Sequence, residues 1–292
     1  MSKPPARSPQ HPIGELSAEL APALYVVATP IGNLRDITLR ALDILSSADR
    51  ILAEDTRQTG KLLDAYDISA KLTAYHDHNA AARIPQVLDW LAEGQSVALV
   101  SDAGTPLVSD PGFKLVRAAV AAGVEVIPLP GASAPLAALV KSGLPSDRFL
   151  FVGFLPPKTS ARQKALSELA EIKATLILFE TGPRIKACLK DIAATLGERD
   201  VVLTRELTKR YEEARHGTPE DLIQSVNDDP PRGEIVLLIG PPKEDILWDE
   251  ARLIEALEAA IPEHGVKRAS AQLADKSGWV KREVYALALT LK

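Results

Sequence analysis

The chain contains little cysteine, few aromatic residues and no long apolar segment. Cys188 is its only cysteine, and aromatic residues make up 4% of its 292 residues. A single cysteine excludes an intramolecular disulfide and a cysteine-rich metal site, so Cys188, which lies in a helical pattern, is expected to be a small core residue. The longest apolar stretches are strand-sized, far shorter than the roughly 20 residues that a membrane-spanning helix needs. We therefore expect a globular protein of the cytoplasm with no contact to a membrane.

Length, charge and the first residues set the expected organisation. Residues 1–12 contain four prolines and no apolar stretch, which excludes a secretory signal in this segment and predicts a disordered tail over residues 1–22. The chain is long enough for two domains and a small third one. Its net charge of −5 does not exclude a nucleic-acid partner, because a local basic patch can neutralise several phosphates.

Strand-like and helix-like segments alternate over residues 23–133. Apolar runs at residues 24–28, 51–53, 97–100 and 124–129 have the length of buried strands, and the segments between them show helical spacing. This alternation predicts a parallel sheet with right-handed crossovers. The carboxyl ends of the four strands are then expected to meet at one edge of this N-terminal α/β domain.

A long connection at that edge is residues 101–112, Ser-Asp-Ala-Gly-Thr-Pro-Leu-Val-Ser-Asp-Pro-Gly. Open α/β sheets bind ligands beyond the carboxyl ends of their strands, and small residues let a ligand approach the backbone. Asp110 is predicted to cap the next helix, with Pro111 as its first residue. This pattern alone leaves two interpretations open, a ligand-binding loop and an ordinary turn.

Rigid or polar residues also follow the other three strands. Residues 29–33 and 130–134 combine proline, glycine and small residues, and residues 54–57 are Glu-Asp-Thr-Arg. Two carboxylates beside a guanidinium at a strand end indicate a functional site. A solvated loop with an internal ion pair is the alternative.

Residues 134–243 are expected to form a second α/β domain. Its predicted strands are residues 149–154, 175–179, 201–204 and 235–239. The connections between them are shorter or less regular than in the first domain, so this sheet is expected to be mixed rather than parallel.

Residues 244–292 are expected to form a small helical module with a basic end. In residues 267–292 six lysine and arginine residues stand against two acidic ones, a balance of +4 in a chain that is acidic overall. Helices with this charge on either side of a glycine turn at Gly278 are typical of a nucleic-acid-binding module. A solvated helical hairpin that covers the core is the alternative.

Six segments, taken together, resemble one family. They are residues 27–34, 53–57, 101–112, 129–134, 154–158 and 180–184. In this order they are similar to the tetrapyrrole-methylase superfamily of S-adenosylmethionine-dependent methyltransferases. More narrowly, they resemble its bacterial branch that methylates the ribose 2′-oxygen of a decoding-region cytidine in 16S rRNA. The resemblance implies two α/β domains of the class III methyltransferase type with a cofactor cleft between them, a homodimer, and the small ribosomal subunit as partner.

The resemblance also implies the cofactor site. The superfamily's cofactor loop has the pattern Gly-x-Gly-Asp-Pro, and residues 102–106 of this chain, Asp-Ala-Gly-Thr-Pro, depart from it at the first glycine and at the aspartate. This departure resembles the RNA-methylating branch and disfavours a tetrapyrrole substrate. The implied S-adenosylmethionine-binding residues are Pro30, Asp102, Ala103, Gly104, Thr105, Pro106, Val108, Ser133, Ala134, Glu180, Thr181 and Gly217.

The catalytic residues are expected after the second strand, where porphyrin-modifying relatives carry a catalytic aspartate. Glu54 or Asp55 occupies that place. A ribose hydroxyl is a poor nucleophile while it is protonated, so our hypothesis is that one of these carboxylates accepts its hydrogen bond. Arg57 then holds a phosphate or orients the carboxylate. No motif requires a metal.

Basic residues in loops, at helix starts and in the tail are the predicted RNA-facing set. They are Lys158, Arg162, Arg184, Lys209, Lys281 and Arg282. The low aromatic content offers little for base stacking, so recognition is expected to depend on ribosomal shape and a splayed nucleotide. The alternatives are a tetrapyrrole carbon-methyltransferase with the same cofactor site and a non-catalytic, cofactor-binding protein associated with the ribosome.

Overall fold

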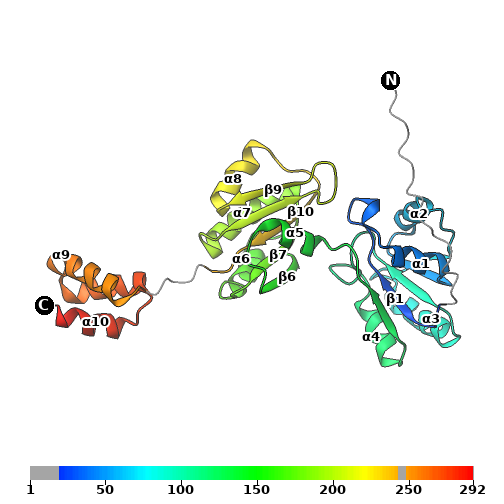
Figure 1. Cartoon of the computed structure of the whole chain (residues 1–292), viewed down its shortest axis with the longest axis horizontal. Coiled ribbons are helices and arrows are strands. Elements are labelled where there is room, and N and C mark those ends of the chain that lie inside the picture. Colours follow the sequence, from blue (N-terminus) through cyan, green and yellow to red (C-terminus); the bar gives the residue numbers. More distant parts are fainter. Residues whose placement is uncertain (1–19, 243–247, 292) are drawn as a thin grey trace, which may run out of the picture. The chain divides into compact units, whose positions relative to one another are not determined.

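The computed structural model describes residues 20–242 and 248–291. They fall into two compact units that divide between Pro241 and Pro242. The first unit contains two five-stranded sheets with helices, and the second consists of helices alone (Figure 1). Most of the segment that the sequence predicts to be disordered, residues 1–22, lies outside the described residues.

The first sheet is parallel throughout, as the alternation of strands and helices predicts. Its order is β3-β2-β4-β1-β5, and every neighbouring pair runs in the same direction. The strands are β1 (Leu24–Val27), β2 (Arg50–Ala53), β3 (Leu72–Ala74), β4 (Val97–Val100) and β5 (Val126–Leu129). All five carboxyl ends therefore lie at one edge. The sequence does not predict β3, because its three residues are only partly buried and give no clear apolar pattern.

Helices pack on this sheet, and each face has its own apolar core. They are η1 (Leu34–Asp36), α1 (Leu39–Ser47), α2 (Thr56–Asp64), α3 (Ala80–Ala92) and α4 (Phe113–Ala121). Tyr25 and Ile51 pack in one cluster, and their neighbours Leu24 and Leu52 pack in the other. Burial on both faces explains why these strands are continuous apolar runs.

The chain enters α4 differently from the prediction. Gly112, with a φ of +137°, is the residue that precedes the helix, and no side chain caps it. A Cβ at this position would lie 2.8 Å from Leu107 and 2.9 Å from Leu99, so the turn requires glycine. The predicted cap by Asp110 is therefore wrong, and its carboxyl is free to serve elsewhere.

The second sheet is mixed, as predicted. Its order is β6-β7-β10-β8-β9, in which β6 and β7 are parallel and the other pairs are antiparallel. The strands are β6 (Phe149–Phe154), β7 (Thr175–Thr181), β8 (Val201–Arg205), β9 (Glu213–Gly217) and β10 (Glu234–Ile239). The sequence does not predict β9, because this edge strand has the polar sequence Glu-Ala-Arg-His-Gly.

One helix packs on one face of this sheet and three pack on the other. They are α5 (Ala134–Ser142) on the first face and α6 (Thr159–Glu168), α7 (Gly182–Leu196) and α8 (Pro219–Asp228) on the second. Cys188 of α7 is buried in the second core, which confirms its predicted role. Thr218 caps α8 in a capping box with Asp221, so this helix begins where its sequence indicates.

The C-terminal unit is a helical pair. α9 (Glu250–Ser277) has a non-helical residue at Gly265, and α10 (Lys281–Thr290) follows the glycine turn at Gly278. Leu253 and Leu257 of α9 pack with Val284 of α10 in a separate apolar core. None of the helices in the two described segments is long and apolar enough to cross a membrane.

Candidate functional site

The loops at the carboxyl edge of the first sheet are joined by hydrogen bonds. The backbone N–H of Thr29 donates to the Gly104 carbonyl at 2.8 Å, and the N–H of Gly104 donates to the Thr29 carbonyl at 2.9 Å. The Thr29 hydroxyl also donates to the Ser101 carbonyl, and the Thr105 hydroxyl donates to the carbonyl of Ala132. The loops after β1, β4 and β5 thus form one connected structure, as convergence of the strand ends predicts.

Gly104 has a structural reason within this edge. Its φ is +81°, and a Cβ would lie 3.2 Å from the Ile31 side chain. Both of its backbone polar groups bond to Thr29. Gly104 therefore shapes the loop. Its backbone N–H is already bonded to Thr29 and is not available to a cofactor.

The carboxylate of Asp55 is a helix cap in an ion pair. It accepts a hydrogen bond from the Arg57 N–H at 2.8 Å, and the Arg57 guanidinium donates to its two oxygens at 3.0 and 2.7 Å. These bonds lower the pKa of Asp55 to about 2. Arg57 itself is 86% exposed. Asp55 is thus ionised, and both of its carboxylate oxygens already accept hydrogen bonds from Arg57. It is therefore a weak proton acceptor, and Arg57 orients this carboxylate.

Glu54 has a different environment. Its carboxylate accepts a hydrogen bond from the Asp102 backbone, and it faces the charges of Asp102, Asp77 and His76. Burial, followed by the charge of Asp102, raises its pKa above the ordinary value for glutamate. Of the two carboxylates predicted after β2, Glu54 is therefore the better proton acceptor.

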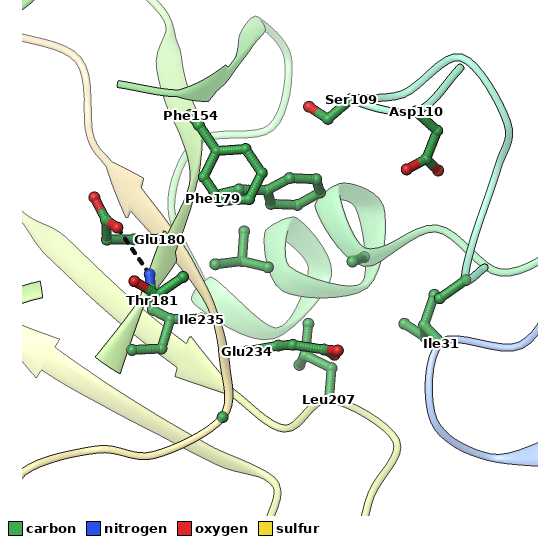
Figure 2. Close-up of a pocket in the computed structure, with 14 residues that line it drawn as sticks. Ile31, Ser109, Asp110, Phe154, Phe179, Glu180, Thr181, Leu207, Glu234 and Ile235 are labelled. Atoms are coloured by element: carbon green, nitrogen blue, oxygen red, sulfur yellow. Dashed lines mark hydrogen bonds between the residues drawn. The ribbon is translucent and has the colours of Figure 1, made fainter. Parts of the chain in front are cut away.

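A cavity of about 270 Å³ lies between these loops and the second sheet (Figure 2). The first α/β half contributes four residues from its loops, and α5, the second sheet and the loops of that sheet contribute the rest. The lining residues are Ile31, Ala103, Ser109, Asp110, Ala134, Phe154, Phe179, Glu180, Thr181, Leu207, Gly233, Glu234, Ile235 and Val236. A hollow of about 340 Å³ adjoins it, because Ile31, Ala103 and Glu234 line both.

Aromatic rings are concentrated at this cavity. Phe179 packs against Phe151 and Phe154 with ring centroids 5.0 and 5.5 Å apart, and Phe154 is 53% exposed. Figure 2 shows the rings of Phe154 and Phe179 side by side on one wall. Three of the five phenylalanines of the chain are thus gathered in one place. The low aromatic content therefore gave a poor indication of the stacking surface that is present.

The predicted cofactor residues occupy several positions around the cavity. Ala103, Ala134, Glu180 and Thr181 line it, and Pro30, Asp102 and Ala103 line the adjoining hollow. Ser133 lines a groove along α5 that shares Leu207 with the cavity. Pro106 is buried, and the N–H of Val108 donates to the Thr105 carbonyl in a turn.

Glu180 borders the cavity with its strand rather than with its carboxylate. The carboxylate is 1% exposed, lies 3.1 Å from Nε of Arg184 and accepts the Thr181 N–H. Leu178, two residues earlier, packs under α7, whereas Phe179 packs on the opposite face of β7. Because side chains alternate along a strand, the Glu180 side chain is on the α7 face, and it holds the start of α7.

Gly217 lies away from the cavity. It pairs with Val201 at the beginning of β8, whereas the cavity lies beyond the other end of β8, at Leu207. The antiparallel course of β9 causes this separation. Gly217 therefore does not line the cavity with the other predicted cofactor residues, and its contact to a cofactor stays a prediction.

The predicted RNA-facing residues differ widely in exposure. Arg162 is 2% exposed and pairs with Asp191 at 2.6 Å, so the prediction that it faces phosphates is wrong. A buried guanidinium needs a carboxylate partner, and this pair joins α6 to α7. Arg184 pairs with Glu180, and Lys209 pairs with Glu206 and Glu234. The exposed members of the set are Lys158, Lys281 and Arg282.

Sequence reasoning missed two groups of residues. Asp110 lines the cavity, and its apparent role as a helix cap concealed it. In the C-terminal unit a hollow beside the break at Gly265 is lined by His264, Lys267, Arg268 and Lys281. Only Lys281 of these was predicted, although the charge balance of the tail pointed to the region.

The family of the chain follows from its sequence. The model of the tetrapyrrole (corrin/porphyrin) methylases matches residues 23–223, which contain the first sheet and the strands β6 to β9 of the second. The chain belongs to the tetrapyrrole methylase family. It is a methyltransferase, and this family implies a methyl donor of the S-adenosylmethionine type.

Curated relatives and solved structures agree with this membership. The methylase is 50% identical to a ribosomal RNA small subunit methyltransferase I of Mesorhizobium japonicum, with 94% of this chain and 93% of that protein covered. It is 48% identical to the protein of that name in Escherichia coli O157:H7, with 91% and 94% covered. Among solved structures, uroporphyrin-III-C-methyltransferase of Thermus thermophilus has a TM-score of 0.54 at 22% identity, with 74% of this chain and 93% of that chain covered. The methyltransferase CobJ has a TM-score of 0.56 at 20% identity, covering 75% and 94%. These two structures share the fold.

Proposed function

We propose that this tetrapyrrole methylase transfers a methyl group from S-adenosylmethionine to the ribose 2′-oxygen of a decoding-region cytidine in 16S rRNA. The observation that carries the proposal is similarity over nearly the whole chain to proteins named ribosomal RNA small subunit methyltransferase I. The unmatched 6% of the chain in the first comparison is shorter than the C-terminal helical unit, so that unit is part of the match. The solved structures of tetrapyrrole-modifying methyltransferases are only 20–22% identical to this chain. This similarity shows a common fold and gives no support for a porphyrin or corrin substrate.

The residues at the cavity fit S-adenosylmethionine. Phe154, Phe179 and Leu207 give an apolar and aromatic wall that suits an adenine ring. On the other side, Asp102 in the adjoining hollow brings a carboxylate that suits a cationic ligand. When bound, this donor supplies an electrophilic methyl carbon on a good leaving group.

The work left to the protein is to orient the acceptor oxygen and to take its proton. Holding two reactants in line contributes on the order of 7 to 11 kcal/mol, and a proton acceptor adds about 10²- to 10⁴-fold in rate. Of the two carboxylates predicted after β2, Asp55 is a helix cap and Glu54 is the better proton acceptor, but neither lines the cavity. Arg57 has the role of holding Asp55 in its capping position.

Exposed cations provide the RNA contacts in this proposal. Lys158 follows β6, whose last residue, Phe154, lines the cavity. In the C-terminal unit Lys281 and Arg282 start α10, and Lys281 shares its hollow with Lys267 and Arg268. These side chains offer phosphate contacts without reading sequence. The aromatic wall can take up a nucleotide ring splayed out of the RNA.

We also infer a homodimer that acts in the cytoplasm, where ribosomal subunits are assembled. The outer face of α5 carries Leu136 and Val140, and Val140 is 87% exposed. Exposed apolar side chains on one helix face are typical of an interface. Sedimentation analysis of the protein with Val140→Glu is expected to show a monomer where the wild type shows a dimer.

Methyl transfer to small ribosomal subunits tests the proposed function. The purified protein is incubated with S-adenosylmethionine and subunits from a strain that lacks the gene, and the 16S nucleosides are analysed by mass spectrometry. We expect the strain to lack one 2′-O-methylcytidine and the protein to restore it. A 16S rRNA with its full set of ribose methyl groups in the deletion strain would contradict the proposal.

A further inference from the structure

Three acidic residues line the cavity, and their partners differ. Glu180 pairs with Arg184 under α7, and Glu234 pairs with Lys209 and is 77% exposed. The carboxyl of Asp110 has the hydroxyl of Ser101 as its hydrogen-bond partner and the charges of Glu54 and Asp102 nearby. Within the described part of the chain, Asp110 forms no ion pair. It is thus the carboxyl at the cavity whose charge no cation neutralises.

The backbone holds Asp110 in place at some cost in energy. Leu107 and Ser109 adopt positive φ values of 73° and 66°, a conformation that is unfavourable for residues with a side chain. Packing fixes this loop from two sides. Leu107 lies against Gly112, and Ser109 lies close to Gly153, where a Cβ would be 3.1 Å from the Ser109 hydroxyl. Gly153 also lies at the irregularity of β6, so the second sheet helps to set the position of Asp110.

The carboxylate points into the cavity. Figure 2 shows it directed from the loop towards the space between the phenyl rings and Ile31. Neither Glu54 nor Asp55 lines this cavity. Among Glu54, Asp55 and Asp110, Asp110 is therefore the one that a ligand in the cavity would contact.

The surroundings of Asp110 also favour proton uptake. Burial raises its pKa to about 6, and the charges of Glu54 and Asp102 act in the same direction, while the hydrogen bond from Ser101 lowers it. A proton acceptor works best when its pKa is near the pH at which the enzyme operates. Asp55, with a pKa of about 2, is far from that condition.

We propose that Asp110, rather than Glu54 or Asp55, is the catalytic carboxylate that accepts the proton of the acceptor hydroxyl. The inference rests on the proposed function, which supplies the ribose 2′-hydroxyl. The hydroxyl oxygen forms a bond to the methyl carbon, and the carbon–sulfur bond breaks with its electron pair going to sulfur. The O–H bond breaks, and the proton passes to an Asp110 oxygen. The products are a methyl ether, a neutral thioether and a protonated carboxyl, so atoms and charges balance.

Single-turnover methylation of small ribosomal subunits tests this assignment. Asp110→Asn keeps the shape of the side chain and its hydrogen bond from Ser101, and we expect the rate constant to fall about 10²- to 10⁴-fold. The wild-type rate is expected to rise with pH through about 6, and this rise is expected to be absent in Asp110→Asn. Glu54→Gln is expected to lose much less activity and to move the midpoint to lower pH, because it removes a neighbouring negative charge. Asp89→Asn, an exposed position on α3, is the matched control.

Two readouts without methyl transfer separate chemistry from structure. We expect the affinity for S-adenosylmethionine, measured by calorimetry, to stay within about tenfold of the wild type in Asp110→Asn, since a uniform loss of binding would indicate a positioning role. We also expect the pH dependence of the melting temperature between about 4 and 6 to be weaker in Asp110→Asn, because the titrating group is removed.

Each result decides between the alternatives. A normal rate in Asp110→Asn with a large loss in Glu54→Gln would overturn the assignment and leave the proposed function intact. Loss of cofactor binding in Asp110→Asn, or an unchanged melting profile with pH, would also overturn it. A wild-type protein that methylates no ribose in the subunits would refute the proposed function itself, and the assignment with it.

Discussion

The side chain of Asp102 accepts a hydrogen bond from the backbone N–H of Asp55, with 3.0 Å between Oδ1 and N. In return, the backbone of Asp102 donates to the carboxylate of Glu54. The loop after β4 is thereby fixed to the loop after β2, although 47 residues separate the first pair. This reciprocal arrangement assigns different tasks to Glu54 and Asp55, which are adjacent in the chain.

Substitutions of Asp55 are expected to affect stability more than chemistry. Asn caps helices about as well as Asp, so Asp55→Asn is expected to retain nearly the wild-type melting temperature and methylation rate. Asp55→Ala removes the cap of α2 and is expected to lower the free energy of unfolding by about 1 kcal/mol. Denaturant unfolding and single-turnover assays measure the two effects. A loss of about 10²-fold or more in rate for Asp55→Asn, with cofactor binding intact, would restore Asp55 as the proton acceptor.

Asp110→Asn is expected to stabilise the protein at neutral pH. The pKa of Asp110 is raised from 3.8 to about 6 in the folded state, so the folded protein binds this proton more tightly than the unfolded chain. The resulting stabilisation is fully present below about pH 3.8 and is lost as the pH rises through about 6. The amide carries no charge, so the variant is expected to gain on the order of 1 kcal/mol at pH 8, a figure reduced for the remaining exposure of the carboxyl. This corresponds to a rise of about 2 to 4 °C in melting temperature.

Scanning calorimetry at pH 8 and pH 4 checks this expectation. The gain is expected to disappear at pH 4, where both side chains are neutral. An equal gain at both pH values would mean that Asp110 is not the titrating group. Substitutions that stabilise a protein while lowering its activity are characteristic of residues under functional constraint.

Phe154→Ala is expected to weaken ligand binding. The exposed ring of Phe154 continues the wall formed by Phe179, and stacking of a nucleobase on an aromatic ring contributes about 1 to 3 kcal/mol. The dissociation constant for S-adenosylmethionine or for RNA is therefore expected to rise about 5- to 150-fold. Phe149→Ala is the control, because Phe149 is similarly exposed at the start of the same strand and does not line the cavity.

The two ligands can be separated in this experiment. An increase for the cofactor alone assigns the ring to adenine, and an increase for RNA alone assigns it to the splayed nucleotide. Unchanged affinity for both would show that the ring is only part of the apolar surface.

Removing charge from the C-terminal hollow is expected to weaken RNA binding. Lys267→Ala, Arg268→Ala and Lys281→Ala in combination remove three cations that line one hollow. Each phosphate contact contributes about 0.7 to 0.9 to the slope of log affinity against log salt, so the slope is expected to fall by about 2 to 3. Lys276→Ala is the matched control, because this exposed lysine is on α9 but does not line the hollow. An unchanged slope with normal cofactor affinity would exclude this hollow from RNA binding.

Strands with continuous apolar runs could be predicted from the sequence, because burial on two faces leaves a clear pattern. β4 and β6 have the predicted bounds. β3 and β9 could not be predicted in this way, since one is very short and the other is a polar edge strand that pairs with β8.

The position of the cavity could be predicted, but not the residues that line it. Loop composition at four strand ends indicated the edge of the sheet beside which the cavity lies. The side chains that matter depend on contacts between distant residues, such as Arg162 with Asp191, which are 29 residues apart, and no local pattern encodes them. Alternation along β7 also decides that Phe179 faces the cavity while Glu180 faces α7, and a matching sequence segment does not distinguish between them.

The crossing from the first sheet to the second takes only residues 130–133, between the end of β5 and the start of α5. α5 packs on the second sheet, with Ala138 and Leu139 in its core, and Ile31 from the first half packs in the same core. Five peptide steps extend to at most about 18 Å, which limits how far the end of β5 can lie from the start of α5. Gly131 approaches the Cβ of Ala28 so closely that a Cβ of its own would lie 2.8 Å away. A larger residue there would push the link away from the end of β1, and with it the start of α5, whose Ala134 lines the cavity.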